Sequence, residues 1–549
     1  MRQVARNGSF TVQAIAGSYV VLLGIDIAEA STQGLLGFAI ERVDKAAGTR
    51  RWLEGQKTFA ETDPGLPAGT SVPTLQHPVQ GFLWQDFTAQ PGREYTYRVV
   101  AMRGEPKDLT QGEVVEVGVT TENEDTGKHA IWFNRGVAGS QAYARKFGNQ
   151  EPDQVADNAA WNWLSRGLVE ALIAYIGQAK NGSFSLRGAL YEFQYAPVLA
   201  AFGAARDLGA DVKLVVDERA NSANTPRGEN QKAIAAAEIN DLVIPRTANP
   251  SAIAHNKFIV LLEDGKPTQV WTGSTNITDG GIFGHSNVGH LVRDPDVAAI
   301  YLNAWERLSK DPESGPLRTD NESASPLPEG LTPEGSITPV FSPRPDLGAL
   351  EWYRDRMDQA GAGVFFTAAF GVNDLFHTVL ATPRDYLRYV LLESDDAKLE
   401  GIDDPNNRIA FGSVLGNNAF ERWLKEKTTN LNTHVRYIHT KYMLVDPLGD
   451  DPLVITGSAN FSNASTKTND ENMLVIRGDK TVADIYLGEF MRLFKHYQYR
   501  DFIQKQNQAA DPAAGGPGRP HLAPDDSWTK ASFTDGTVQQ KERKLFAAA

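Results

Sequence analysis

Cysteine is absent from the 549-residue chain, which excludes disulfide bonds and thiolate metal sites. The absence does not identify the compartment, because proteins of every compartment can lack disulfides. No apolar run approaches the ~20 residues that a helix needs to cross a bilayer, so no transmembrane segment is expected. A signal peptide is not obvious either, since Ser9–Ile15 alternates like a β-strand. We expect a cytoplasmic protein, or one exported without an obvious signal peptide.

An excess of positive charge is also absent. The 54 basic and 68 acidic residues give a net charge of -14, while 41% of the residues are hydrophobic and 22% are charged. This composition is typical of globular proteins. The negative balance favours solubility and argues against a nucleic-acid coat protein, but it does not exclude a local basic cleft. The length predicts about three to four domains, or one large bilobal enzyme.

Residues 1–124 have the pattern of an all-β region, with short β-rich runs between clusters of Gly, Pro and Asp. The runs are Tyr19–Ile27, Leu36–Val43, Tyr95–Met102 and Val114–Thr120. The segment Pro91–Ala101 resembles the penultimate strand of a fibronectin type III sandwich, in which a turn precedes a tyrosine corner and an alternating strand. The resemblance predicts a β-sandwich without a catalytic role.

From residue 125 onward, strands and helices alternate, which predicts an α/β fold of mixed sheets flanked by helices. Residues 311–336 are rich in Pro, Ser, Glu and Gly and predict a linker between two lobes. We therefore expect lobe 1 at 125–330, lobe 2 at 331–505, and a linker and tail at 506–549. The alternative interpretation of the linker is an ordinary long loop.

Two segments of the α/β region repeat each other without a gap, at the single offset that superposes His255 on His439. The first reads A-H-N-K-F-I-V-L from Ala254 and the second I-H-T-K-Y-M-L-V from Ile438. At the same offset, the T-G-S-x-N that begins at Thr272 superposes on the one that begins at Thr456. A purely structural repeat preserves apolar positions and glycine. This one preserves His, Lys, Ser and Asn, which indicates a shared chemistry.

The local structure expected of each half explains the spacing. Residues i and i+2 of a strand face the same side, so His and Lys of each H-x-K project together. The following strand ends in T-G-S-x-N, where Gly permits a tight turn and Ser and Asn offer donors to a phosphate. Two facing halves suit a phosphodiester: one His attacks phosphorus, the other protonates the leaving oxygen, and the cationic and polar groups hold the oxyanions. No metal and no other cofactor is required.

These residues resemble the signature of the phospholipase D superfamily, H-x-K-x4-D followed by G-S/G-x-N. The resemblance covers residues 125–505 and implies two lobes related by a pseudo-twofold axis and a covalent phosphohistidine. By this resemblance, the catalytic residues are His255, Lys257, His439, Lys441 and Glu471. The phosphate-binding residues are Ser274, Asn276, Ser458 and Asn460, and the structural acid of the motif is Asp446. Glu471 matches the acidic residue that orients a catalytic His.

The first half departs from the family pattern at two places. Leu262 stands where the motif has Asp, and the counterpart of Glu471 is predicted at Gly289, which has no carboxylate. A backbone carbonyl or another acid would then have to orient one histidine. The family order makes His255 the nucleophile, although the carboxylate asymmetry leaves that order open.

Two further segments bear on the site. His285 and His290 do not have the spacing of a known metal site, so no metal is expected; His285 or Phe283 would instead line the substrate entrance. The segment Thr367–Asn373 parallels Leu190–Gln194 of the first half and is either a strand end at the pocket or a core strand.

The sequence therefore predicts a metal-independent phosphodiester hydrolase whose active site forms within one chain. Its expected partner is a phospholipid or another phosphodiester, with transient contact to a membrane surface. One alternative is a nuclease of the same superfamily, which needs a basic channel with stacking aromatics. The other is a non-catalytic binding or scaffold protein with a degenerate phosphodiesterase fold.

Overall fold

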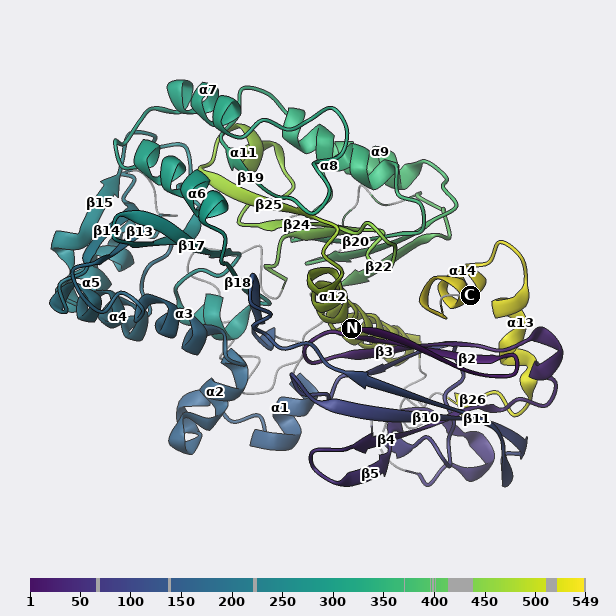
Figure 1. Ribbon diagram of the computed structural model, residues 1–549. Coiled ribbons are helices and arrows are strands. Elements are labelled where there is room, and N and C mark those ends of the chain that lie inside the picture. The colour runs from purple at the N-terminus through teal and green to yellow at the C-terminus, as the bar shows by residue number, and fades with distance from the viewer. Residues whose placement is uncertain are drawn as a thin grey trace.

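The computed structural model describes residues 1–65, 70–136, 140–220, 225–369, 371–394, 396, 399, 401–412, 438–509 and 521–547. An all-β region comes first in the chain, two lobes with mixed sheets follow, and the C-terminal segment returns to the all-β region (Figure 1).

The N-terminal region is a sandwich of two four-stranded sheets. One sheet has the order β1 (Arg2–Asn7), β2 (Phe10–Ala16), β3 (Val21–Asp26), β9 (Leu83–Asp86), and the other β11 (Asp108–Thr120), β10 (Glu94–Glu105), β4 (Gly37–Asp44), β5 (Thr49–Trp52). The Tyr95 hydroxyl accepts from the backbone N–H of Gln90 at 3.0 Å, so the tyrosine fixes the turn before β10. The predicted all-β fold is confirmed, whereas the fibronectin type III resemblance stays a prediction.

The two lobes each contain a seven-stranded sheet with the same strand order. Lobe 1 has β12 (His129–Phe133), β18 (Val288–Val292), β17 (Lys266–Gly273), β16 (Lys257–Glu263), β13 (Phe184–Leu190), β14 (Asp211–Asp217) and β15 (Val243–Arg246). Lobe 2 has β19 (Ile337–Ser342), β25 (Glu471–Arg477), β24 (Leu453–Gly457), β23 (Tyr442–Val445), β20 (Gly363–Ala368), β21 (Leu387–Leu392) and β22 (Asn407–Phe411). The predicted pair of mixed α/β lobes is confirmed.

Helices lie against both sheets (Figure 1). Those of lobe 1 are α1 (Ser140–Phe147), α2 (Ala159–Ser165), α3 (Leu168–Ile176), α4 (Ala196–Asp207), α5 (Arg227–Ala236) and α6 (Pro295–Leu308). Those that follow are α7 (Ser314–Ala324), α8 (Gly348–Asp358), α9 (Asp374–Ala381), α11 (Asn463–Lys467), α12 (Lys480–Ala509), α13 (Lys530–Phe533) and α14 (Val538–Ala547). Because both faces of the sheets are covered, central strands such as β16 and β23 are almost wholly apolar and buried.

The interlobe connection, predicted as a linker or an ordinary long loop, contains the helix α7 within residues 311–336. Its Gly315 and Pro316 lie in the first turn, where a helix tolerates both. Leu317 and Asn321, one helical turn apart, are buried and attach α7 to the protein. Composition alone therefore did not predict this short amphipathic helix.

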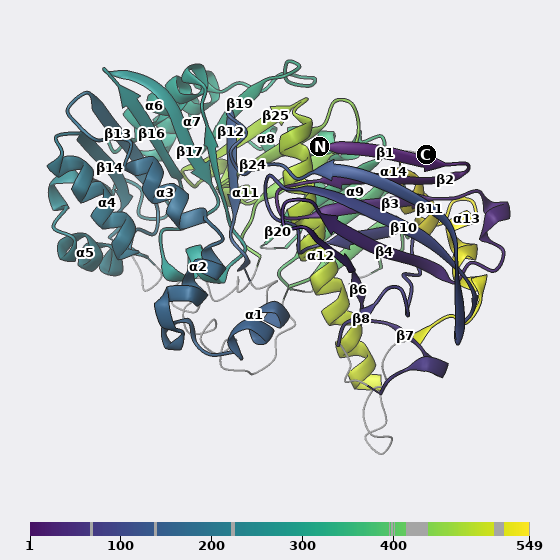
Figure 2. The ribbon, with the colours of Figure 1, turned by 60° about the horizontal axis from the view of Figure 1, so that its bottom comes forward.

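Helix α12 lies between the sandwich and the lobes (Figure 2) and contacts β2, β12, β22, β23 and β24. The sandwich approaches it closely at Gly488, where an added Cβ would lie 3.3 Å from Cβ of Val20. Arg166 of lobe 1 forms a buried ion pair with Glu489 of this helix at 2.5 Å. Among the described residues, no helix has the combined length and apolar character of a membrane span.

The C-terminal segment packs against the earlier domains instead of forming a separate tail. Strand β26 (His521–Leu522) pairs in parallel with β7 (Thr58–Phe59), and the short strands β6 (Glu54–Gly55) and β8 (Val72–Pro73) pair beside the sandwich. Trp528 stacks on Phe82 with ring centroids 5.2 Å apart. Glu542 accepts from the Tyr389 hydroxyl of lobe 2 at 2.7 Å, so α14 joins the sandwich to lobe 2. The predicted second linker, Ala509–Pro524, lies largely outside the described residues.

Candidate active site

The two H-x-K segments meet where the lobes face each other. Isolated parallel bridges join Ala254 to Asp470 and Ser286 to Ile438, and these two pairs are equivalent under the offset of the repeat. Each bridge places the residue before a motif histidine next to the opposite lobe. His255 and His439 are therefore brought to one site from distant positions in the chain, and both are buried.

Glu471 of lobe 2 orients His255 of lobe 1. The imidazole Nδ1 lies 2.8 Å from Glu471 Oε2. Ser458 donates to the same carboxylate oxygen at 2.7 Å, and Ser465 donates to the other oxygen at 3.0 Å. Because the carboxylate accepts at Nδ1, the lone pair of Nε2 is left for chemistry.

Asn287 of lobe 1 has the equivalent place beside His439 of lobe 2. Its Oδ1 accepts from Nδ1 of His439 at 2.9 Å and from the Ser274 hydroxyl at 2.8 Å. The Asn287 amide is fixed in this orientation because its Nδ2 donates to the carbonyl of Gly281 at 2.7 Å. The prediction of Gly289 as the counterpart of Glu471 is wrong: Asn287 is the residue that the offset of the repeat superposes on Glu471.

Gly289 has a packing role instead. A Cβ added there would lie 2.2 Å from the Trp271 ring, which stacks on Trp132 at a centroid distance of 5.5 Å. The indole therefore leaves no room for a side chain at position 289. The Gly289 prediction came from aligning Asn287 with Asn469 because both are asparagines, which shifts the alignment of the two halves. The ungapped offset of the repeat instead aligns Asn287 with Glu471, as the structure does.

Burial sets the protonation of both histidines. It lowers the pKa of His255 to about 4, against the opposing charge of Glu471, which raises it. Burial also lowers the pKa of His439 well below its ordinary value, and the nearby Lys441 charge adds to the shift. Both imidazoles are thus neutral near pH 7 without substrate. His439 Nε2 is buried and has no hydrogen-bond partner among the described residues.

The two motif lysines are buried near each other at the site. The Nζ atoms of Lys257 and Lys441 each donate to the backbone carbonyl of the preceding motif histidine at 2.6 Å. Burial lowers the pKa of Lys257 to about 8, and burial together with the charge of Lys257 lowers that of Lys441. An anion bound between them would offset both effects, because an opposite charge favours the ammonium form.

The two motif asparagines offer buried acceptors, and one of them binds an acid that we did not predict. The Oδ1 atoms of Asn276 and Asn460 have no hydrogen-bond partner among the described residues. Asn276 Nδ2 donates to Glu192, whose pKa is raised to about 7 by burial despite the opposing charge of Lys257. The sequence feature that could have identified Glu192 is its position shortly after the apolar end of strand β13.

Two more buried carboxylates support the backbone in front of the histidines. Asp217 accepts from the N–H of Ala254 at 3.1 Å, and Glu393 accepts from the N–H of Ile438 at 2.9 Å. Burial raises the pKa of Asp217, against the lowering effect of Arg219. Both acids directly follow a run of buried aliphatic residues, in strands β14 and β21, which have equivalent places in the two sheets; this pattern could have identified them.

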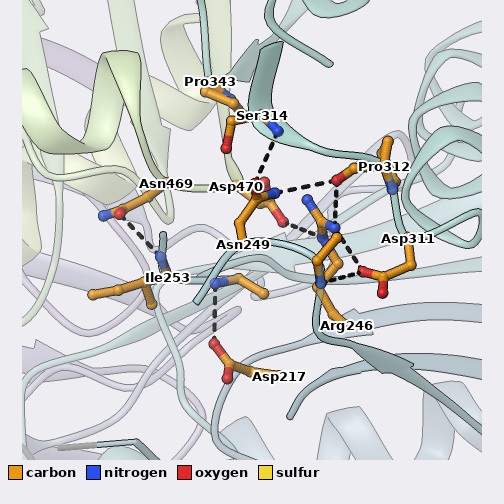
Figure 3. Close-up of polar contacts among 12 residues, drawn as sticks. Asp217, Arg246, Asn249, Ile253, Asp311, Pro312, Ser314, Pro343, Asn469 and Asp470 are labelled. Carbon is orange, nitrogen blue, oxygen red and sulfur yellow. Dashed lines mark hydrogen bonds and ion pairs between the residues drawn. The ribbon is translucent and has the colours of Figure 1, made fainter. Parts of the chain in front are cut away.

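Further contacts across the lobe boundary surround this backbone (Figure 3). Arg246 at the end of β15 donates to Asp470 of lobe 2 at 2.9 Å and to Asp311 at 2.7 Å. Asn469 accepts from the N–H of Ile253 at 3.2 Å. Asp470 is the chain neighbour of Glu471, so these interface contacts hold the Glu471 carboxylate against its histidine.

A cavity of about 170 Å³ lies on the lobe 2 side of the site. Its lining is Thr367, Ala368, Ala369, Gly371, Val372, Asn373, Lys441, Asn460, Phe461 and Ser462. The interpretation of Thr367–Asn373 as a strand end at the pocket is therefore confirmed for the described residues of that segment.

The remaining sequence candidates have separate places. Asp446 accepts from the N–H groups of Gly361, Ala362 and Gly363 at 2.8, 2.7 and 2.9 Å, so it supports the turn before β20. Its counterpart Leu262 is buried within β16. The described residues contain no cluster of three or more His, Cys, Asp or Glu placed to hold a metal.

His285 and His290 lie in different surroundings. The His285 ring is 5.3 Å from that of His439, which places it at the site. His290 is buried in the lobe 1 sheet, where it bonds to His129 at 2.9 Å and to Tyr486 at 3.0 Å. Phe283 contacts the ring of Trp161 at 4.5 Å.

Part of the chain is similar to a known protein family. Residues 172–309 and 393–494 match the model of the family described as "Cardiolipin synthase, PLD-like domain". A 75-residue segment is 37% identical to the mitochondrial cardiolipin hydrolase of Xenopus tropicalis; it covers 13% of this chain and 33% of that relative.

Phosphatidylserine synthase of Haemophilus influenzae Rd KW20 aligns over 61% of this chain and 85% of its own, at 12% identity and a TM-score of 0.40. The phospholipase D family member Nuc of Salmonella typhimurium aligns over 26% of this chain and 87% of its own, at 28% identity and a TM-score of 0.21. The family match covers both H-x-K segments and both T-G-S-x-N turns. Residues 172–309 and 393–494, which lie in the two lobes, are thus similar to the PLD-like domain of the cardiolipin synthase family.

Proposed function

We propose that the protein is a metal-independent phosphodiester hydrolase that acts through a covalent phosphohistidine, with phospholipid as its substrate class. The observation that carries the proposal is the cross-lobe pairing of the two histidines, each held through Nδ1 by a residue of the other lobe. This leaves two Nε2 atoms for one phosphorus centre. The intact and oriented pair argues against a non-catalytic scaffold.

In the first step, Nε2 of His255 attacks phosphorus and forms the P–N bond while the P–O bond to the leaving group breaks. The Glu471 carboxylate stabilises the positive charge on the phosphorylated ring, since it accepts at Nδ1. Lys257 and Lys441 hold the non-bridging oxygens, where negative charge gathers in the transition state.

His439 protonates the leaving oxygen in this scheme. Its partner Asn287 is neutral, so the imidazolium has no carboxylate to stabilise it and gives up its proton readily. The anionic substrate favours the protonated ring before the reaction. In the second step, neutral His439 takes a proton from water or an alcohol, which attacks phosphorus and releases His255.

A phospholipid is favoured over nucleic acid on two grounds. The matched family is described as cardiolipin synthase, and the curated relative is a cardiolipin hydrolase. The chain has a net charge of -14, which disfavours non-specific attraction to a polyanion. A membrane-surface contact during turnover belongs to the same proposal.

The test is hydrolysis of phospholipid vesicles and of single- and double-stranded DNA in parallel, with chelator present. Lipid cleavage that is lost in His255→Ala and in His439→Ala, and kept in the exposed control His521→Ala, is the expected result. Cleavage of DNA alone, or cleavage that chelator abolishes, would overturn the proposal.

We also propose the domain boundaries 1–124, 125–330, 331–505 and 506–549, with a fibronectin type III-like sandwich first. The support is the pair of four-stranded sheets and the Tyr95–Gln90 contact at the corner before β10. An experimental structure in which the strand connections depart from that fold would refute the sandwich assignment.

A further inference from the structure

Glu192 is a buried acid at the active site that the proposed mechanism does not use. It directly follows Tyr191, whose ring centroid lies 5.0 Å from that of His255 and 5.3 Å from the ammonium of Lys257. Its own carboxylate accepts from Nδ2 of Asn276, one of the two motif asparagines. Burial of a carboxylate is costly, so its place beside the motif residues requires an explanation.

The backbone around Glu192 is fixed to the rest of lobe 1. The N–H of Ile277, directly after the first T-G-S-x-N turn, donates to the Glu192 carbonyl at 3.0 Å, and Ile277 also forms a bridge with Phe193. Asn230 of α5 donates to the carbonyl of Tyr191 and accepts from the N–H of Phe193, both at 2.9 Å. These contacts hold the carboxylate beside the turn, so its position does not depend on a bound ligand.

The charge of Glu192 acts on both motif lysines. Burial lowers the pKa of Lys257 and of Lys441, and the charges of Glu471 and Glu192 oppose that effect at each lysine. In return, the two lysines oppose the burial that raises the pKa of Glu192 to about 7. When all four groups are ionised, the two ammonium groups and the two carboxylates carry no net charge. Glu192 therefore offsets a positive charge that the lysines would otherwise present to an anion.

This balance separates phosphate ligands by their charge. A phosphodiester has one negative charge, and the proton that the proposed mechanism puts on His439 compensates it. A phosphomonoester has two negative charges above its second pKa of about 6. The same groups leave the second of these charges uncompensated. Because electrostatic interactions are strong in a buried site, one such charge has a large effect on affinity.

We propose that Glu192 is a specificity-determining residue, whose negative charge lets the site hold a singly charged phosphodiester and repels the doubly charged phosphomonoester that hydrolysis produces. The inference rests on the proposed function. In its second step, the water oxygen forms a new P–O bond, the P–N bond to His255 breaks, and His439 takes one proton of the water. The other hydrogen stays on the product, which ionises to the dianion near neutral pH. Repulsion by Glu192 then favours release of the product and limits product inhibition.

The experiment measures how methyl phosphate and dimethyl phosphate inhibit cleavage of a p-nitrophenyl phosphodiester by the full chain at pH 8, where Glu192 is ionised. The two ligands are similar in size but carry two charges and one. The wild-type inhibition constant for methyl phosphate should be at least about tenfold higher than that for dimethyl phosphate. Glu192→Gln keeps an acceptor for Asn276 and removes the charge. It should tighten dimethyl phosphate about tenfold and methyl phosphate about 10²-fold, because the electrostatic energy scales with the charge of the ligand.

The ratio of the two inhibition constants distinguishes charge selectivity from a structural role, which would change both constants equally. Glu192→Asp retains the charge and should keep the wild-type preference for dimethyl phosphate. The matched control Glu229→Gln, at an exposed ion pair with Lys232, should keep it as well. An equal change of both constants in Glu192→Gln, or a wild-type preference for methyl phosphate, would overturn the inference and leave the hydrolase proposal in place. Absence of phosphodiester cleavage by the wild-type protein would instead contradict the proposed function and this inference with it.

If Glu192→Gln does not fold, the pH dependence of the wild-type ratio decides. At pH 5 both ligands carry one charge and Glu192 is protonated, so the two inhibition constants should be nearly equal. By pH 8 the constant for methyl phosphate should have risen at least about tenfold relative to that for dimethyl phosphate. A ratio that stays constant, or that falls between the two pH values, would contradict the proposed role of Glu192.

Discussion

The His255 half and the His439 half share a strand order and a motif, yet they differ in the groups that surround each imidazole. Glu471 holds His255 with a negative charge, whereas Asn287 holds His439 with a neutral amide. Tyr191 covers the first half, whereas Ala369 opens the second onto a cavity. In the proposed mechanism the two equivalent halves have different chemical roles, and the structural difference that supports this lies in the partners of the two histidines.

The largest expected effect separates the two histidines by leaving group. His439→Asn should reduce cleavage of an alkyl phosphodiester by about 10³-fold, because a poor leaving group needs its proton. With a p-nitrophenyl ester the first step should lose far less, and the phosphoenzyme should accumulate. Burst kinetics on both esters measure this. Equal losses on the two esters would contradict the role of His439 as general acid.

Glu471→Gln should have the next largest effect, because it removes the charge that stabilises the phosphorylated His255 ring. We expect kcat to fall by about 10²-fold or more on alkyl and nitrophenyl esters alike, since the attack itself is impaired. Steady-state kinetics on the two esters test this. A loss confined to alkyl esters would assign Glu471 to the general acid instead.

Asn287→Asp would make the two halves more alike. A carboxylate beside His439 raises the pKa of that imidazole, so the protonated form should persist to higher pH while becoming a weaker acid. We expect the alkaline limb of the kcat profile to move upward by about one pH unit and the maximum to fall about tenfold. A downward shift of that limb would show that the ring acts in its neutral form in the step that limits kcat.

The smallest effect should come from the backbone supports. Asp217→Asn and Glu393→Gln weaken the hold on the N–H groups of Ala254 and Ile438, and each should lower kcat about three- to tenfold with KM unchanged. Each should also reduce the free energy of unfolding by about 1–2 kcal/mol. Asp211→Asn, at an exposed ion pair with Arg187, is the matched control and should change neither. A rise in KM alone would point to substrate binding.

The sequence predicted the parts of the site that the repeat itself contains. Both H-x-K segments, both T-G-S-x-N turns and the two mixed sheets could be located from the offset between His255 and His439 and from the strand-like runs. The same offset also places Asn287 opposite Glu471, but matching by residue type led to Gly289. The residue type at an equivalent position can differ between the two halves, as it does for Glu471 and Asn287. The offset of the repeat is therefore a better guide than residue type to the partner of each histidine.

Other features depend on how the lobes pack and could not be predicted from local patterns. Glu471 and His255 are far apart in the sequence, and their contact exists only because the two sheets meet. The attachment of α14 to both the sandwich and lobe 2 likewise joins segments that are distant in the sequence. Helix α7 was not predicted because Gly and Pro favour a linker in a composition-based prediction, even when they occupy the first turn of a helix.

The measurement that tests the central claim most directly is the site of phosphorylation. The enzyme is mixed with a labelled phosphodiester, quenched in base to preserve phosphohistidine, digested, and the modified peptide is mapped by mass spectrometry. The asymmetry between Glu471 and Asn287 predicts the label on His255, with more of it in His439→Asn and none in His255→Ala. Label on His439 in the wild-type enzyme would reverse the two roles and contradict the account.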